Sequence, residues 1–401
     1  MIAHIISRKH EYRILAAIYA LSLSLSFFLA WFSESNIPKG AGYRADWNRY
    51  CDRHPVLFGF HRFDFEYYQD IAEHGYSYQG DVCKPTNIKF FPIYPLLIRT
   101  FSYAGPSSEM AGLVCSNLAA LAGILLLFEL LSTFLSARAS ISAIILMLSF
   151  PSAFFLHAPY SESIYLLLFA LAGLCWQKGK TAQAALYCGI LSATRLPGVT
   201  LPISFAIDAL LSGFGTGRKS ALARAGILAG SGAAGILLFD LYLRLRTGSS
   251  VFLFKAIMEC QYSAHVCKRL TDYFPALWNV LTHRSDFLSP HGINALTTMT
   301  TAVATAAIIF VPGVPGWLKI SGILYSIVVY RLGCGFLPGA YRFSLLNLSF
   351  PVLGAMILSH GFGRRVSGIL MKSAIILIFA IHLVLRMHAT VMFSSGRWNY
   401  F

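Results

Sequence analysis

Charged residues are scarce in this chain of 401 residues, because only 12% are Asp, Glu, Lys or Arg, against about a quarter in typical soluble domains. Hydrophobic residues make up 56% of the sequence, which is more apolar surface than a water-soluble fold can bury. These proportions exclude a soluble globular protein and predict an all-α polytopic membrane protein. We expect residues 1–401 to form a single integral-membrane domain.

Acidic residues are the scarcer charge, with 17 Asp and Glu against 32 Lys and Arg and a net charge of +15. The basic residues fall mainly in short connectors between apolar segments. Such a distribution sets the orientation of helices in a bilayer and does not indicate nucleic-acid binding. We therefore expect membrane lipids as partners, including anionic head groups, and no nucleic acid.

Cysteine shows no zinc-binding pattern, because the eight residues lack the paired spacing of such sites. Four of them lie in pairs within predicted polar loops: Cys51 with Cys83, and Cys260 with Cys267. These pairs can form disulfides where the loops face an oxidising compartment, and free thiols are the alternative.

Histidines in the first polar loop, His54, His61 and His74, give no metal pattern either. Their spacing does not match that of a HExxH ligand pair, and single loop histidines are usually solvated. We expect no metal and no other cofactor.

Long apolar segments fill most of the chain, and about 20 apolar residues suffice for a transmembrane helix. We predict about eleven spans, at residues 14–32, 110–135, 141–157, 163–177, 181–211 (two short spans), 225–245, 293–311, 318–332, 343–359 and 369–387. Residues 90–103 are apolar but contain Pro92 and Pro95. We interpret this segment as an interfacial or re-entrant helix that guides a lipid chain along the bilayer edge.

Two large polar loops separate some of these spans, at residues 33–108 and 246–292. Placing the N-terminus inside brings the basic connectors inside as well, including Arg138, Lys178 and Arg218. Both large loops then lie on the non-cytoplasmic face.

The first of these loops concentrates the acidic residues, since eight of the 17 lie at positions 34–81. Within it, Asp64, Tyr68 and Ile71 share one face of a predicted amphipathic helix. A carboxylate held just outside the bilayer can deprotonate a hydroxyl nucleophile, and partial burial tunes it for this role. The alternative is that these acids simply solvate an exposed loop.

Three further charged residues lie close to the predicted membrane. Glu162 follows a helix start, where it stabilises the helix dipole or faces the same outer cavity as Asp64. Arg195 interrupts an apolar stretch, so it binds a phosphate or extends to the head groups. Arg342 flanks the turn 333–341, predicted outside, where a lipid phosphate would lie.

Several motifs occur in a characteristic order. They are Phe63-Asp64-x3-Tyr68-x2-Ile71-Ala72-Glu73-His74-Gly75-Tyr76, Phe90-Phe91-Pro92-x2-Pro95, Tyr160-Ser161-Glu162-Ser163, Thr194-Arg195-x2-Gly198, and Tyr341-Arg342-Phe343 with Pro351. This order resembles the PIG-V (GPI mannosyltransferase 2) family of the GT-C superfamily. The chain departs from it at Phe63, where the family has Trp, and in residues 44–59, which have no counterpart.

The resemblance implies a GT-C-like multispan glycosyltransferase that takes a sugar, typically mannose, from a polyprenyl-phosphate donor. The acceptor would be a hydroxyl of a glycan or glycolipid on the non-cytoplasmic face. Asp64 would be the general base of an inverting reaction, with Arg342 and then Arg195 binding the donor phosphate. Substrate hydroxyls would be bound by Glu73, His74, Tyr76 and Glu162.

The compact chain is more similar to prokaryotic relatives than to the eukaryotic enzymes. We therefore expect the inner membrane of a bacterium with the active site facing the periplasm, or the endoplasmic reticulum membrane in a eukaryote. The alternative function is a lipid or solute transporter or flippase without transfer chemistry.

Overall fold

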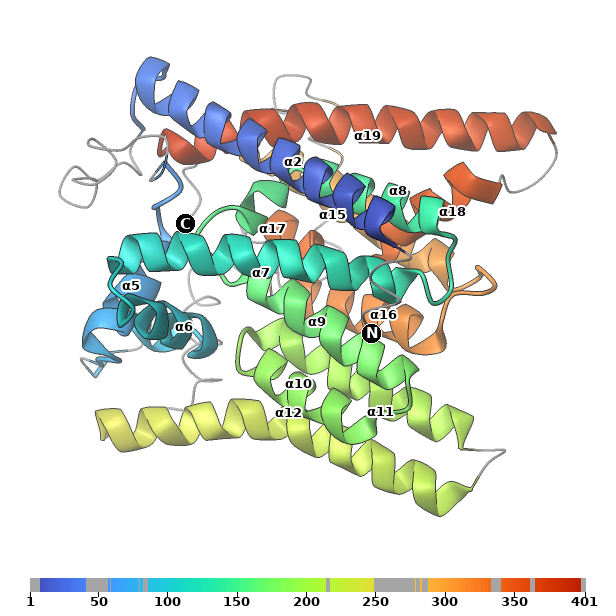
Figure 1. Ribbon diagram of the computed structural model, residues 1–401, viewed down its shortest axis with the longest axis horizontal. Coiled ribbons are helices and arrows are strands. Elements are labelled where there is room, and N and C mark those ends of the chain that lie inside the picture. Colours follow the sequence, from blue (N-terminus) through green and yellow to red (C-terminus); the bar gives the residue numbers. More distant parts are fainter. Residues whose placement is uncertain are drawn as a thin grey trace.

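The computed structural model describes residues 8–40, 57, 59–78, 80–81, 86–213, 217–248, 278, 282, 288–332, 340–360 and 365–397. All regular elements within these ranges are helical (Figure 1). The α-helices are α2 (Lys9–Asn36), α5 (Asp64–His74), α6 (Ile93–Ser102), α7 (Ser108–Leu131), α8 (Ala137–Ser149), α9 (Glu162–Gln177), α10 (Thr181–Ser192), α11 (Thr200–Ser212), α12 (Arg218–Thr247), α15 (Pro290–Ile308), α16 (Gly316–Leu332), α17 (Ala340–Ser344), α18 (Ser349–His360) and α19 (Arg365–Ser394). Short 3-10 helices are η1 (Asn87–Lys89), η2 (Ala153–Leu156) and η3 (Leu196–Val199).

Membrane-spanning character is clear in the described helices. Four of them, α2, α7, α12 and α19, are long and apolar enough to cross a membrane, and six shorter helices are also apolar. The predicted all-α membrane architecture is therefore confirmed. The segment 181–211 forms two helices, as expected, because α10 ends at Ser192 and α11 begins at Thr200.

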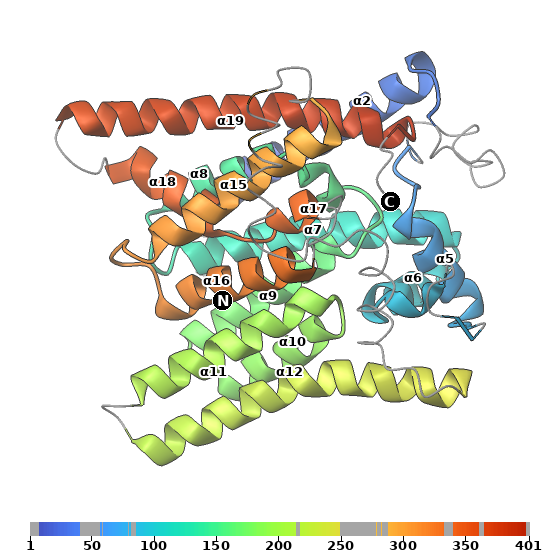
Figure 2. The same ribbon diagram turned by 180° about the vertical axis from the view of Figure 1, so that it is seen from behind.

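The bundle is layered, as two opposite views show. In Figure 1, α2 and α19 lie along one edge, α12 lies along the opposite edge, and α7 and α9 run between them. Seen from behind in Figure 2, α15 and α16 lie in front of this middle layer. The main helix–helix contacts join α7 with α9, α9 with α10, α10 and α11 with α12, α8 with α18, and α2 with α19.

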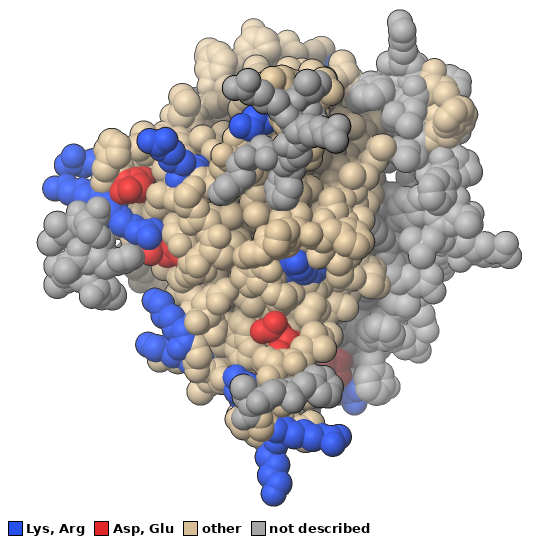
Figure 3. Space-filling view, turned by 90° about the vertical axis from the view of Figure 1, so that its right-hand side faces the viewer, with Lys and Arg blue, Asp and Glu red and all other residues tan. Residues whose placement is uncertain are grey.

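One end of the bundle carries α5 and α6, together with the last turns of α2, α12 and α19 (Figure 1). The short connectors lie at the other end, where Lys and Arg side chains outnumber acidic ones (Figure 3). These connectors include Arg138 at the start of α8, Lys178 after α9 and Arg218 at the start of α12. The separation of the two ends agrees with the expected orientation, which stays a prediction. We refer to the α5 end as the outer end.

Helices α5 and α6 lie in the described part of the first large loop. Helix α5 ends at Gly75, whose φ of 86° is readily adopted by glycine, and the Gly75 N–H donates to the Ile71 carbonyl. Pro92 caps α6, as expected for a proline at a helix start. With ten residues, α6 is only about 15 Å long, too short to cross the bilayer.

Several predictions fall outside the described residues. They concern the disulfide candidates Cys51, Cys83, Cys260 and Cys267, most of the loop 246–292, and residues 333–339 of the predicted turn 333–341.

Candidate active site

Asp64 is the first residue of α5, and its backbone is set by an unusual neighbour. Phe63 has a φ of 53°, the only positive φ of a non-glycine residue in the described ranges. A conformation of this kind costs about 1–3 kcal/mol and collects at functional sites. The Phe63 ring packs edge-on against Phe393, with centroids 5.2 Å apart. The side chain of Asp64 keeps 22% of its surface exposed, so it is accessible but largely enclosed.

Arg342, from α17, joins two carboxylates that are distant in sequence. Its Nη1 group donates to Asp64 Oδ2, while Nε and Nη2 donate to the two carboxylate oxygens of Glu162, the latter at 3.2 Å. Aromatic rings enclose the guanidinium, with Tyr160 at 4.5 Å and Phe155 at 4.9 Å. Arg342 is therefore held in one orientation, with one arm on each acid.

Glu162, the first residue of α9, has a second cationic partner. Its Oε1 lies 2.5 Å from Nη1 of Arg195, in an ion pair that is almost completely buried. Arg195 has an extended backbone between α10 and η3, and its guanidinium lies 4.6 Å from the Phe343 ring centre. The interruption between α10 and α11 thus brings the Arg195 guanidinium into contact with Glu162.

We call Asp64, Glu162, Arg195 and Arg342 the charged cluster. Two carboxylates and two guanidiniums cancel, so the cluster is neutral, as a buried group of charges must be to avoid a large desolvation cost. Burial would lower the pKa of Arg342, but Glu162 and Asp64 raise it well above its usual value, so the guanidinium stays charged. All four residues were predicted separately as site residues, and the structure brings them together.

A neutral hydroxyl lies beside this cluster. Burial raises the pKa of Tyr68, which therefore stays protonated, and its hydroxyl lies 3.2 Å from Ser161 Oγ. Tyr68 follows Asp64 by one helical turn on the predicted face of α5.

The remaining predicted substrate residues lie elsewhere. Glu73 is at the far end of α5, where its carboxylate accepts hydrogen bonds from Ser108 and Gln69. His74 is 72% exposed and pairs with Asp70 at 3.1 Å. Neither residue joins the charged cluster, and their roles stay predictions.

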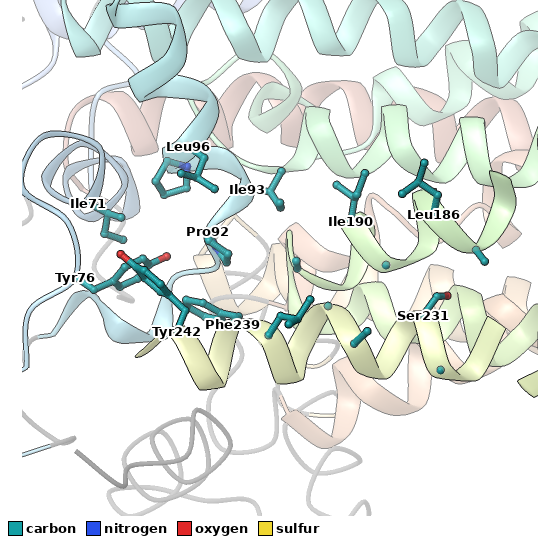
Figure 4. A pocket seen from close by; sticks show the side chains of 18 of the residues that line it. Ile71, Tyr76, Pro92, Ile93, Leu96, Leu186, Ile190, Ser231, Phe239 and Tyr242 are labelled. Carbon is teal, nitrogen blue, oxygen red and sulfur yellow. The ribbon is translucent and has the colours of Figure 1, made fainter. Parts of the chain in front are cut away.

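Tyr76 is buried and belongs to the wall of a groove. Its hydroxyl donates to the Phe90 carbonyl at 2.7 Å, and its ring contacts Phe239 and Tyr242 of α12. The groove has a volume of about 840 Å³ and runs between the α5–α6 region, α10 and α12 (Figure 4). On α12 it extends from Ile227 to Tyr242, a length of about 22 Å.

The lining of this groove is almost entirely apolar, and its small residues leave space between the helices. An ideal Cβ built on Gly230 meets no atom within 4 Å, so the space in front of it is free. Ala193, which lines the groove just after the end of α10, precedes Arg195 by two residues, a separation of at most about 7 Å. One end of the groove therefore lies close to the backbone of Arg195.

Metal ligands do not gather in the part of the chain that the structure describes: no group of three or more His, Cys, Asp or Glu there could hold an ion. The expectation of a metal-free and cofactor-free site stays a prediction.

Sequence comparison adds no family: no protein-family model matches the chain, and no curated protein matches it. The resemblance to the PIG-V family is therefore not confirmed.

Solved structures do match this arrangement of helices. ArnT from Cupriavidus metallidurans, bound to undecaprenyl phosphate, matches with a TM-score of 0.52 and 12% identity, over 96% of this chain and 77% of that chain. The Archaeoglobus fulgidus oligosaccharyltransferase in complex with zinc and sulfate matches with a TM-score of 0.50 and 14% identity, over 93% and 53%. The chain has the GT-C fold.

This GT-C chain spans about half the length of the oligosaccharyltransferase that it matches. The apo form of the same transferase gives a TM-score of 0.50 at 12% identity. At these identities the likeness establishes the fold, and the chemistry must be argued from the residues of this chain.

Proposed function

We propose that this GT-C protein is a glycosyltransferase that uses a polyprenyl-phosphate sugar as donor. It would transfer the sugar, mannose by resemblance, to an acceptor hydroxyl at the outer end. The observation that carries the proposal is the charged cluster, whose four residues come from distant segments of the chain. Beside it lies a groove large enough for a lipid chain. The undecaprenyl phosphate bound to ArnT is a further support, because that ligand belongs to the same chemical class.

The donor lipid would lie with its isoprenoid chain in the groove along α10 and α12. This placement explains why a feature about 22 Å long is lined by apolar and small side chains. The phosphate would then meet Arg342 and Arg195, whose guanidinium N–H groups can donate to its oxygens.

In the reaction, Asp64 would act as general base. It would take the proton of the acceptor hydroxyl as that oxygen forms a bond to the anomeric carbon. The bond from this carbon to the phosphate oxygen breaks on the opposite side, so the configuration inverts and the lipid phosphate leaves. Arg342 and Arg195 would stabilise the charge that develops on the leaving oxygen.

The charges of the cluster fit this sequence of events. At rest, Arg342 is bound to Asp64, and the cluster is neutral. When Asp64 gains the proton it loses its charge and releases Nη1 of Arg342. At the same moment the leaving phosphate acquires a second negative charge. Proton transfer to Asp64 would therefore free Nη1 of Arg342 at the step in which the leaving phosphate gains its negative charge.

The decisive experiment incubates the purified protein with polyprenyl-phosphate mannose and a mixture of glycan and glycolipid acceptors. We expect sugar-dependent release of lipid phosphate, which the Asp64→Asn variant loses. Asp70→Asn is the matched control, because Asp70 lies on the same helix and pairs with His74 outside the cluster. Movement of intact donor between leaflets without release would favour the flippase and refute the transferase.

The site would face the periplasm in a bacterium, or the lumen of the endoplasmic reticulum in a eukaryote. A cysteine placed at His74, which is 72% exposed at the outer end, tests this orientation in a variant whose eight native cysteines are replaced by serine. We expect a membrane-impermeant thiol reagent to label it in right-side-out vesicles. Labelling only after the vesicles are opened would reverse the orientation.

A further inference from the structure

A polar pocket of about 280 Å³ lies at the outer end, apart from the charged cluster. It is lined by Ala72, Glu73, Arg99, Ser102, Tyr103 and Ser108. These residues come from the last turns of α5 and α6 and the first turn of α7. Glu73 follows Asp64 by nine residues, which places it about 13 Å along the helix axis and half a turn around it.

Hydrogen bonds hold the floor of this pocket in place. Ser108 Oγ and Gln69 Nε2 both donate to Glu73 Oε1, the latter at 2.9 Å. The same Gln69 nitrogen lies 2.7 Å from Oε1 of Glu109, which is buried. Arg99 donates to the Glu73 carbonyl at 3.4 Å. These hydrogen bonds fix the positions of the polar groups that line the pocket.

The lining is polar but its charges balance, since Glu73 and Arg99 carry opposite signs. An anion would be repelled by Glu73 and by the carboxylate of Glu109 beneath it. An apolar ligand would displace water from the carboxylate and the guanidinium without replacing the hydrogen bonds of that water. A neutral polyol satisfies both, because each hydroxyl can donate to the carboxylate and accept from the guanidinium.

Tyr103 adds an apolar surface at this site. Its side chain is 83% exposed, so the ring is free to pack against the C–H face of a sugar. Arg99 lines both this pocket and the apolar groove, so the two cavities are adjacent.

We propose that this pocket binds a neutral sugar unit of the acceptor, distinct from the sugar that reacts. The inference rests on the proposed transferase function and narrows its acceptor. A sugar held at Glu73 is too far from Asp64 to be the nucleophile itself. The acceptor is therefore an oligosaccharide or the glycan of a glycolipid, rather than a single sugar or a protein hydroxyl.

Binding is tested directly with methyl α-mannoside and an α-linked mannobiose as probes. Saturation-transfer NMR on the full chain in detergent should detect the sugars with the wild type. We expect Glu73→Gln and Arg99→Gln each to weaken binding about tenfold or more, because each removes a charged hydrogen-bond partner. Tyr103→Ala should also weaken sugar binding. Because the Tyr103 side chain is exposed, we expect this substitution to leave the fold intact. Asp70→Asn should bind as the wild type does.

Kinetics separate this subsite from the reacting centre. Tyr103→Ala should raise the acceptor KM and leave the donor KM within about twofold, because Tyr103 lines this pocket and not the groove. Asp64→Asn should lose transfer and keep sugar binding.

Sugar binding that is equal in the wild type, Glu73→Gln and Arg99→Gln would overturn the subsite. So would the absence of sugar binding in a protein that binds undecaprenyl phosphate and transfers sugar. The reverse result, sugar binding at this pocket without transfer from any polyprenyl donor, would overturn the transferase and leave the pocket as a sugar site.

Discussion

We expect the Asp64→Asn substitution to have opposite effects on catalysis and on binding of the lipid phosphate. The substitution keeps the shape of the side chain and removes its charge. Transfer should fall by about 100- to 10,000-fold, because the general base is lost. Binding of the lipid phosphate should instead become tighter, since Arg342 is no longer held by a second carboxylate and can turn Nη1 to the phosphate.

The size of this gain follows from the burial of the pair. A hydrogen bond to a charged group contributes about 1.5–3 kcal/mol. Asp64 keeps 22% of its side chain exposed, and Arg342 keeps 5%, so solvent weakens the pair only moderately. We take the lower part of that range and expect undecaprenyl phosphate to bind roughly tenfold more tightly to the variant.

The assay is a calorimetric titration of undecaprenyl phosphate into wild type and Asp64→Asn in the same detergent. A double-mutant cycle adds Arg342→Gln, in which the Asp64 substitution should give no gain because the arm it frees is absent. Asp70→Asn controls for the loss of one acidic charge from α5. Equal or weaker binding by Asp64→Asn would falsify the competition between carboxylate and phosphate for Arg342.

Three further changes test the scaffold of the site. Glu162→Gln leaves two buried guanidiniums short of a partner, so we expect a loss of about 3–5 kcal/mol of folding free energy, seen as a lower melting temperature. Gly198→Ala places a Cβ 2.2 Å from the Leu191 carbonyl oxygen. We expect a cost of about 1–3 kcal/mol and lower transfer as the turn moves. Gly230→Phe fills the groove and should weaken donor binding roughly tenfold. Gly226→Phe, one turn away and outside the groove lining, should bind donor normally in the same titration.

Much of the helical scaffold was predictable from hydropathy, as the interrupted segment 181–211 shows. Its break was expected at Arg195–Gly198, and α10 does end just before it. Helix ends were less predictable. Helix α12 begins at Arg218, seven residues before the expected start at Ala225. Hydropathy marks the part of a helix that lies in lipid, whereas the helix itself continues into the head-group region.

The site was predictable as a set of residues but not as a set of contacts. Arg195 and Arg342 were expected to bind a phosphate, which stays a prediction, and the structure adds that both contact Glu162. A sequence gives the kind of side chain and its approximate depth, but the pairing depends on where distant helices cross. Glu73 shares a motif with Asp64, yet nine residues turn it to the other side of α5.

The groove was not predicted from the sequence, although the spacing of small residues gives a weak signal for it. Small residues recur every three or four positions on α10, at Ala182, Ala185 and Gly189, and on α12, at Gly230 and Ala234. Such spacing normally indicates close packing of membrane helices. These two helices do pack closely at one point, since a Cβ on Gly235 would lie 2.2 Å from the Gly189 carbonyl oxygen. Only the structure separates the stretch that packs from the stretch that stays open.

Arg386 shows why burial alone does not identify a functional arginine in this bundle. An ionisable group inside a membrane helix is a functional hypothesis by default, and Arg386 of α19 is only 2% exposed. Its guanidinium, however, donates to the carbonyls of Leu148 and Ser22 and to Ser26 Oγ. These contacts fasten α19 to α8 and α2, and a carbonyl has no protonation step that would release the arginine. Arg342 differs because its partners are carboxylates, and one of them, Asp64, can be neutralised by the proton that the proposed reaction produces. We therefore propose, from its exchangeable partner rather than from its buried charge, that Arg342 and not Arg386 takes part in the reaction.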